Sequence, residues 1–192
     1  IVRQKYGVDP SKIVTVHNGV EPFNGLTNKK NFQNKKARTV TFLGRITVQK
    51  GPRYFVEVAQ KVLEKMDDVQ FVMAGSGDML KPMIDLVAEL NLSEKFHFPG
   101  FLKGDQVRQM LNDSDIFIMP SVSEPFGICP LEAMYCKVPS IISLQSGVSE
   151  VVNHVVKVDF WDTDAMADAV YSILKRPVLK RTLIKNGARE VR

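Results

Sequence analysis

The sequence predicts an α/β domain built on a parallel sheet with helices on both faces. Short runs of β-branched and apolar residues recur along the chain, and segments with apolar residues at helical spacing separate them. Strands that alternate with helices of this length are typical of right-handed βαβ units. The strands are apolar throughout, as expected when both faces of a sheet are covered. We therefore expect a Rossmann-like, doubly wound domain.

Five segments carry the strand pattern. Each is short, rich in Val, Ile, Phe or Thr, and followed by glycine or another turn residue. A further apolar stretch at residues 13–16 is a candidate strand near the start of the chain. In chain order, the expected strands of the sheet are residues 39–43, 69–74, 96–98, 116–119 and 138–142.

Five helices are expected between and after these strands. Residues 53–66 place their apolar side chains on one face of a helix. Asp78 is a suitable cap for a helix that runs to about residue 90, and Pro82 is tolerated in its first turn. In chain order, the expected helices are residues 53–66, 78–90, 105–111, 128–136 and 164–174.

Residues 1–38 differ from the rest of the chain. They hold turn signals such as Asp9-Pro10, Asn18-Gly19 and Asn24-Gly25, and residues 27–38 have the composition of an exposed loop. We interpret residues 1–38 as a linker and lead-in segment, and residues 39–192 as the folded domain. Ile1 in place of methionine suggests a piece of a larger protein.

The chain has a net charge of +5, which by itself suggests a polyanionic partner. The charge is unevenly placed, however: +6 over residues 1–38, −7 over residues 39–172 and +6 over residues 173–192. An acidic body with two basic flanks does not form a nucleic-acid-binding face. No apolar run approaches the roughly 18 residues that cross a membrane. Two cysteines seven positions apart do not form a disulfide framework, and we expect a cytoplasmic setting.

Polar and glycine residues follow every expected strand. In an open parallel sheet, ligands bind outside the carboxyl ends of the strands. A sheet edge without a ligand would not need small, glycine or charged residues in every loop, so we expect a binding cleft there. The loops are residues 44–51, 75–77, 100–103, 120–127 and 143–150.

Two groups of charged residues in these loops indicate the ligand. Arg45 and Lys50 lie five positions apart on one loop, so both cations can converge on one anion. Gly127 opens a helix whose first N–H groups face the same edge, which together with the cations favours a diphosphate. Glu124 and Glu132 cannot share a helix face, so each is expected to accept hydrogen bonds from hydroxyls on a different part of a long ligand.

Three other patterns were considered. Asp113-Ser114-Asp115 has the D-x-D form of some metal sites, but it precedes a strand, on the edge away from the cleft. Gly75-Ser76-Gly77 lacks the third glycine of a dinucleotide fingerprint, with Leu80 in its place. With no C-x-x-C pair and three scattered histidines, no zinc site is expected.

The segment 123–134, with Glu124 and Glu132 eight positions apart, resembles the E-x7-E signature of the group 1 retaining glycosyltransferases of the GT-B fold, the glycogen synthase-like superfamily. The loop 44–51 resembles the G-R-x4-K-G donor loop of that family, and residues 16–20 resemble its interdomain linker. The similarity covers essentially the whole chain. It implies the C-terminal, donor-binding half of a two-domain enzyme.

The resemblance also implies residue roles. Arg45 and Lys50 would hold the diphosphate of a nucleotide sugar, Glu132 its ribose, and Glu124 a hydroxyl of the transferred sugar. Arg45, Lys50 and Glu124 are thus the implied catalytic residues. The implied donor-binding residues are Gly44, Gly75, Gly77, Phe101, Leu102, Phe126, Gly127, Ile128, Leu131 and Glu132.

The implied function is transfer of a hexosyl group, with glucosyl favoured, from a nucleoside-diphosphate sugar to a glycan or other acceptor. The resemblance implies retention of anomeric configuration, no metal or other cofactor, and an inactive fragment in the absence of the N-terminal acceptor domain. Ser146-Gly147 replaces the family's double glycine, although Glu150 is retained, so sugar identity is the least constrained property. Two alternatives remain: the NAD(P)-binding domain of an oxidoreductase, and a non-catalytic glycan-binding module.

Overall fold

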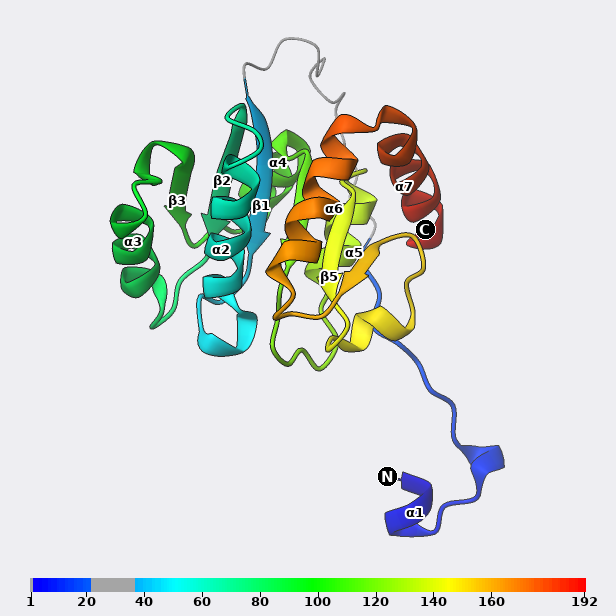
Figure 1. The fold of residues 1–192 in the computed structure, drawn as a ribbon. Coiled ribbons are helices and arrows are strands. Elements are labelled where there is room, and N and C mark those ends of the chain that lie inside the picture. The colour runs from blue at the N-terminus through cyan, green and yellow to red at the C-terminus, as the bar shows by residue number, and fades with distance from the viewer. Residues whose placement is uncertain (1, 22–36) are drawn as a thin grey trace.

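The computed structural model describes residues 2–21 and 37–192. Six parallel strands form one sheet in the order β3-β2-β1-β4-β5-β6, which confirms the doubly wound α/β fold (Figure 1). The strand order reverses between β1 and β4, and such a reversal opens a crevice at the carboxyl ends of the two strands. The strands are β1 (Arg38–Leu43), β2 (Val69–Ala74), β3 (Phe96–Gly100), β4 (Ile116–Met119), β5 (Ser140–Ser143) and β6 (Val156–Val158).

Helices cover both faces of the sheet. One face carries α2 (Pro52–Leu63), α3 (Leu80–Glu89) and α6 (Thr163–Lys175), and the other carries α4 (Asp105–Asp113) and α5 (Cys129–Tyr135). The last helix, α7 (Pro177–Glu190), packs against both α6 and α5 at the edge of the sheet (Figure 1).

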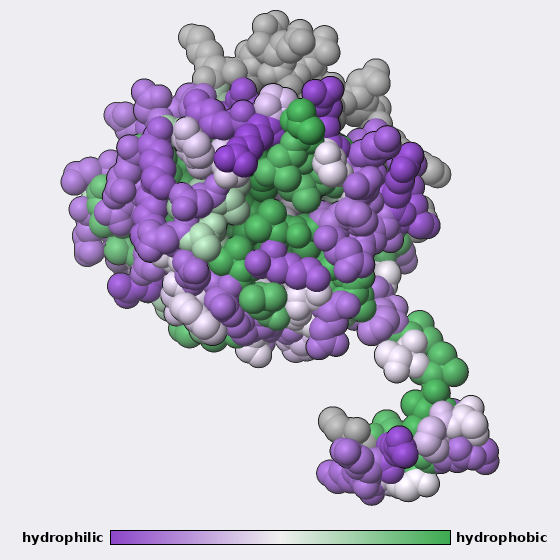
Figure 2. All heavy atoms as spheres, turned by 45° about the vertical axis from the view of Figure 1, so that its right-hand side comes forward, coloured by the Kyte–Doolittle hydropathy of each residue, from purple (hydrophilic) through white to green (hydrophobic). Residues whose placement is uncertain are grey.

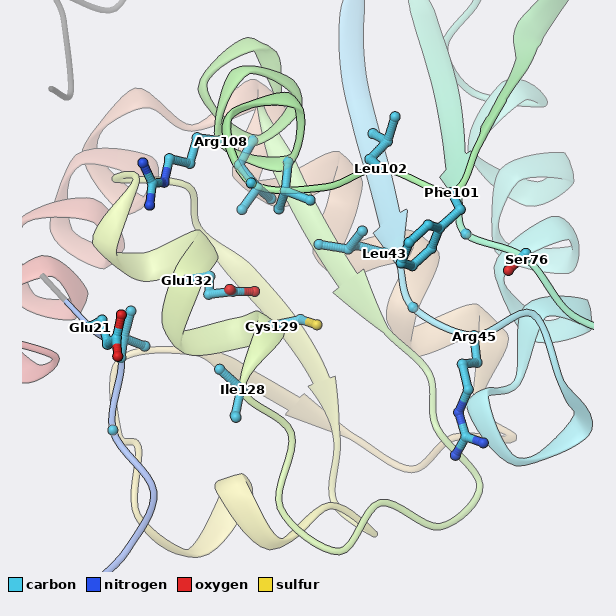
Figure 3. Close-up of a pocket in the computed structure, with 17 residues that line it drawn as sticks. Glu21, Leu43, Arg45, Ser76, Phe101, Leu102, Arg108, Ile128, Cys129 and Glu132 are labelled. Atoms are coloured by element: carbon cyan, nitrogen blue, oxygen red, sulfur yellow. The ribbon is translucent and has the colours of Figure 1, made fainter. Parts of the chain in front are cut away.

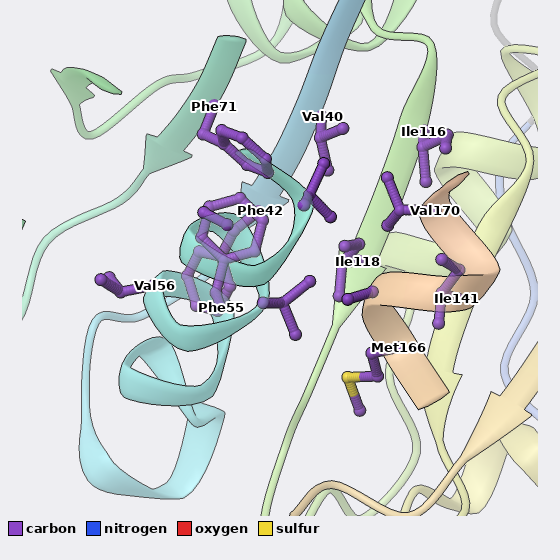
Figure 4. Close-up of a cluster of buried hydrophobic side chains, with 14 of the residues drawn as sticks. Val40, Phe42, Phe55, Val56, Phe71, Ile116, Ile118, Ile141, Met166 and Val170 are labelled. Atoms are coloured by element: carbon purple, nitrogen blue, oxygen red, sulfur yellow. The ribbon is translucent and has the colours of Figure 1, made fainter. Parts of the chain in front are cut away.

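The larger hydrophobic core lies between the sheet and the pair α2 and α6 (Figure 4). Phe55 of α2 is fully buried, and its ring lies 5.7 Å from that of Phe42 and 5.8 Å from that of Phe71. Burial of one such side chain contributes about 1.5–3 kcal/mol. This packing holds the ends of β1 and β2, and the loops that follow them, in fixed positions.

The five expected strands of the sheet and the five expected helices are present, and most of them have shifted ends. The helix expected at 53–66 runs from Pro52 to Leu63, because proline suits a first helical turn. The strand expected at 138–142 begins at Ser140, and the helix expected at 128–136 begins at Cys129. Residues 13–16 are not a strand, because they have no neighbour to pair with.

Two elements of the domain were not anticipated. β6 adds three residues, Val156–Val158, to the edge of the sheet beside β5. Its β-branched run was visible in the sequence and would have supported a short strand. α7 begins with Pro177 and turns Leu179 and Leu183 toward the core, an i, i+4 pair that the sequence also contains.

The segment before the domain buries no side chain in its helix α1 (Val2–Tyr6), and it projects away from the body (Figure 1). Val14 and Val16 are more than four-fifths exposed, and the stalk that leads away from the body is hydrophobic, whereas the far end of the segment is largely hydrophilic (Figure 2). The loop expected at residues 27–38 lies almost entirely outside the described residues. The division of the chain at residue 38 stays a prediction.

Candidate ligand-binding cleft

Two adjoining cavities lie at the carboxyl edge of the sheet, where β1 and β4 end. The first has a volume of about 510 Å³ and the second about 330 Å³. Leu43 and Gly44 after β1, and Ile128 and Cys129 at the start of α5, line both cavities. The two cavities are therefore one cleft with two chambers, which we call the first and the second chamber (Figure 3 shows the first).

The loop after β1 forms one wall of the cleft and is hydrogen-bonded to the loop after β2. Ile46 is fully buried, its N–H donates to the Ser76 carbonyl at 2.9 Å, and its carbonyl accepts from the Met79 N–H at 3.0 Å. Gly75 has a φ of +144°, and a Cβ there would lie 1.8 Å from the Gly44 carbonyl oxygen. Glycine at position 75 is thus needed because two backbones meet there.

Lys50 is held beside the loop that follows β4. It ends a short 3₁₀ turn, Val48–Lys50, and Gly51 then adopts a φ of +66° with its Cα against the Pro120 carbonyl. The Gln49 carbonyl accepts from the Val122 N–H at 2.9 Å. These contacts bring Lys50 to Glu124, across 74 positions of sequence.

Lys50 and Glu124 form an ion pair in the second chamber. Their side chains are only 19% and 9% exposed, respectively, so the pair is shielded from water. The backbone of Glu124 is fixed as well, because its N–H donates to the Gln145 carbonyl at 3.3 Å and its carbonyl accepts from the Gly147 N–H at 2.9 Å. The second chamber therefore presents a cation and a carboxylate in contact.

Arg45 is exposed and lines the first chamber, with its side chain directed away from Glu132 (Figure 3). Arg45 and Lys50 thus line different chambers in this structure and do not converge on one point. The physical reason is the carboxylate of Glu124, which attracts the ammonium group of Lys50. The two cations flank Gly44, which both chambers share.

Glu132 projects from α5 into the first chamber (Figure 3). Burial raises the pKa of its carboxyl group, while a hydrogen bond from the Cys129 thiol and the charge of Arg108 act in the opposite direction. Burial, together with the charge of Glu132, raises the pKa of Cys129 to about 12, so the thiol is a hydrogen-bond donor and not a nucleophile.

Most residues that the sequence singled out line this cleft. Glu124 and Glu132 lie in different chambers, as their spacing suggested. Gly77 and Leu131 line neither chamber: Gly77 packs against the Ile46 backbone, and Leu131 is buried under residues 17–20. The first chamber contains Gly44, Arg45, Gly75, Phe101, Leu102, Ile128 and Glu132, and the second contains Gly44, Lys50, Glu124, Phe126, Gly127 and Ile128.

The structure adds lining residues that sequence reasoning missed. Arg108 and Val107 of α4 reach the first chamber, and Met119 and Ser121 reach the second. Cys129 also lines both chambers, and its position within the E-x7-E segment could have indicated this from the sequence. Nothing in the sequence indicates that one turn of α4 faces the cleft.

The D-x-D segment has a structural role. Asp115 is 2% exposed; its carboxylate accepts from Lys180 of α7 at 2.6 Å and from the Thr39 N–H at 3.1 Å. It lies at the amino end of β4, away from the cleft. Within residues 2–21 and 37–192, no three His, Cys, Asp or Glu side chains gather as a metal site requires.

The doubly wound sheet with helices on both faces is the Rossmann-like fold of GT-B enzymes, and solved glycosyltransferases superpose on it with TM-scores of 0.74 to 0.78. The chain matches the family "Glycosyl transferases group 1" over residues 25–190. It belongs to that family. The oxidoreductase alternative is thereby set aside.

Three similar proteins illustrate the relationship. An uncharacterized glycosyltransferase of Methanocaldococcus jannaschii is 30% identical over 97% of this chain and 51% of its own length. The 2-deoxystreptamine N-acetyl-D-glucosaminyltransferase of Niallia circulans is 32% identical over 80% of this chain and 40% of its own. The crystallised C-terminal domain of a group 1 glycosyltransferase from Francisella tularensis has a TM-score of 0.75 and 24% identity, over 88% of this chain and 92% of that one.

The chain thus spans about half the length of the curated relatives it matches. The Francisella structure is titled a C-terminal domain and is covered almost completely by the same fold. Among the described residues, none of the helices has the length and apolar character needed to cross a membrane.

Proposed function

We propose that this chain is the donor-binding half of a retaining glycosyltransferase. In this proposal, the enzyme transfers a hexosyl group, glucosyl first among the candidates, from a nucleoside-diphosphate sugar to a glycan or other acceptor. The observation that carries the proposal is the division of the cleft. One chamber holds a half-buried carboxylate and an apolar wall, the other holds a shielded cation and carboxylate, and the two meet at Gly44.

The chambers suit the two ends of a nucleotide sugar. The first is the larger, and Phe101, Leu102 and Val107 give it the apolar surface that a base requires. Glu132 lies there to accept hydrogen bonds from the ribose hydroxyls. The second chamber is smaller, and Glu124 lies there to accept hydrogen bonds from hydroxyls of the transferred sugar.

The diphosphate then lies between the chambers, with Arg45 on one side and Lys50 on the other. An ammonium group has three N–H donors, so Lys50 can retain Glu124 with one and reach a phosphate oxygen with another. As the sugar departs, negative charge grows on the leaving diphosphate, and these cations stabilise it. Loss of one such contact typically raises the barrier by roughly 2.7–4 kcal/mol. We infer that protein cations replace a metal in this role.

We propose that most of the acceptor side is supplied by the half of the enzyme that this chain does not span, and that residues 1–192 bind the donor but do not turn it over. Cys129 and Cys136 are thiols and not a disulfide, which is consistent with the cytoplasm that we propose as the location. The relatives' names, which include an N-acetyl-D-glucosaminyltransferase, a glucosyltransferase and a galactosyltransferase, support a hexosyl or amino-hexosyl group as the one transferred.

Isothermal titration of the chain with UDP-glucose, ADP-glucose, UDP-galactose and UDP-N-acetylglucosamine tests the proposal, in buffer with and without EDTA. We expect binding of at least one nucleotide sugar, unchanged by EDTA, and no glycoside product from the chain alone. A folded chain that binds none of them would refute the donor assignment. Binding of free sugars with no dependence on the nucleotide would instead indicate a glycan-binding module.

A further inference from the structure

Three aromatic side chains form a continuous cluster outside the cleft. Tyr54 of α2 packs edge-on against Phe160, with ring centroids 5.2 Å apart and planes at 65°. Phe160 in turn packs against Trp161 at 4.8 Å and 84°. Trp161 is 58% exposed, although large aromatic side chains are usually well buried. We call these three residues the aromatic ridge.

Hydrogen bonds connect the aromatic ridge to Gln145 and Gly51, which are a hydrogen-bond partner of Glu124 and the chain neighbour of Lys50, respectively. The side-chain oxygen of Gln145 accepts from the Phe160 N–H at 3.3 Å, and the Gln145 carbonyl accepts from the Glu124 N–H at 3.3 Å. On the other side, the Tyr54 N–H donates to the carbonyl of Gly51, the residue after Lys50, at 3.1 Å. The ridge is therefore fixed directly beside the chamber that we assign to the transferred sugar.

The chemistry around Trp161 suits a sugar better than a protein surface. Pyranose rings have an apolar C–H face, which packs on an indole ring, and a rim of hydroxyls, which needs hydrogen-bond acceptors. Asp159 and Asp162 flank the ridge in sequence, and Asp159 is oriented by a 2.7 Å hydrogen bond from the Gln145 amide. Aromatic side chains are enriched in the cores of protein–protein interfaces, but aspartate is depleted there, so the neighbouring aspartates are what favour a sugar. An exposed indole between carboxylates is a surface for a hydroxylated ring.

We propose that the exposed face of Trp161 binds a sugar ring of the acceptor glycan, next to the second chamber. The inference rests on the proposed function, because it places an acceptor sugar beside a donor sugar. It goes beyond it in assigning part of the acceptor surface to this half of the enzyme. The ridge would hold a glycan in place without taking part in the chemistry.

Trp161 is the single tryptophan of the chain, so its fluorescence reports on this surface alone. We would titrate the chain with maltotriose, triacetylchitotriose and lactose, with and without UDP, and measure the emission of Trp161. A saturable shift with at least one of these oligosaccharides is expected. A companion measurement by saturation-transfer NMR should show W161A binding that sugar roughly three- to tenfold more weakly, as expected for the loss of one ring-stacking contact.

The affinity for UDP separates this proposal from the donor assignment. W161A should bind UDP with the affinity of the wild-type chain. V178A, which removes an exposed side chain on α7, should leave the affinities for UDP and for the oligosaccharide unchanged. If the chain binds UDP but responds to none of the oligosaccharides, the proposal for Trp161 is overturned and the donor assignment stands. Undiminished oligosaccharide binding by W161A would have the same consequence. If the aromatic ridge serves only as a contact surface for the other half of the enzyme, the chain should bind UDP and none of the oligosaccharides. Loss of UDP binding by the folded wild-type chain would overturn the donor assignment itself.

Discussion

The ion pair between Asp115 and Lys180 fixes α7 to the amino end of β4, and its removal should lower stability strongly. Substitution of Lys180 by methionine keeps the length of the side chain but leaves the carboxylate of Asp115, which is 2% exposed, without its cation. Loss of one partner of a buried pair costs about 3–5 kcal/mol. Because Lys180 itself is 17% exposed and water can enter in its place, we expect the lower end, about 3 kcal/mol.

Urea denaturation followed by circular dichroism measures this effect. With a slope of about 2 kcal/mol per molar urea, the midpoint of K180M should fall by about 1.5 M. Lys185→Met on the same helix is the matched control, because Lys185 is exposed, and its midpoint should move little. The double variant D115N/K180M should recover much of the loss, since no buried charge then lacks a partner. Equal midpoints for K180M and K185M would refute the reasoning.

Two further predictions concern the loops and the C-terminus. Gly75→Ala should unfold the chain or lower its free energy of unfolding by more than 2 kcal/mol, because the added Cβ meets the Gly44 carbonyl. Gly44→Ala, which places its Cβ in open space, should have a smaller effect. Equal thermal midpoints for the two variants would contradict this prediction. Burial favours a raised pKa for Glu190, but hydrogen bonds from His154 and Asn153 outweigh it and lower the pKa. The contribution of the Glu190 carboxylate to the free energy of unfolding is therefore complete above about pH 4.5, and it is lost as the pH falls through the lowered pKa of Glu190. Glu190→Gln should cost about 1–3 kcal/mol at pH 7, and the urea midpoints of the two proteins should converge as the pH falls through the lowered pKa of Glu190; a pH-independent gap would contradict the assignment.

The sheet could be predicted from sequence where strands are apolar on both faces. β2 and β4 have the predicted bounds because all of their residues except Gln70 are apolar. α7 was missed because its apolar stripe is narrow and most of its surface is basic, so the helix depends on tertiary contacts such as the one between Lys180 and Asp115. β6 has only three residues, too few for a periodic signal.

The motif residues of the site were locatable because each lies in a loop that follows a strand or, for Glu132, in the helix after that loop. The pairing of Lys50 with Glu124, however, could not be predicted from the sequence. Lys50 meets Glu124 because β1 and β4 are neighbours in the sheet, although two strands separate them in sequence. Spacing along the chain therefore suggested that Lys50 joins Arg45, while the fold places it with a carboxylate. The effect of the Arg108 charge on the pKa of Glu132 likewise depends on the fold, which brings α4 and α5 to the same chamber.

The affinities for UDP and uridine, measured by isothermal titration on the wild-type chain and on Arg45→Ala, test the central claim most directly. Arg53→Ala is the control, because Arg53 is exposed and pairs only with Glu57 among the ion pairs of the described residues. If Arg45 holds the diphosphate, its loss should weaken UDP binding about 10- to 100-fold, as expected for a charged hydrogen bond, and leave uridine binding within twofold. Equal losses for the two ligands, or none for UDP, would contradict the assignment of this cleft to a nucleoside-diphosphate sugar.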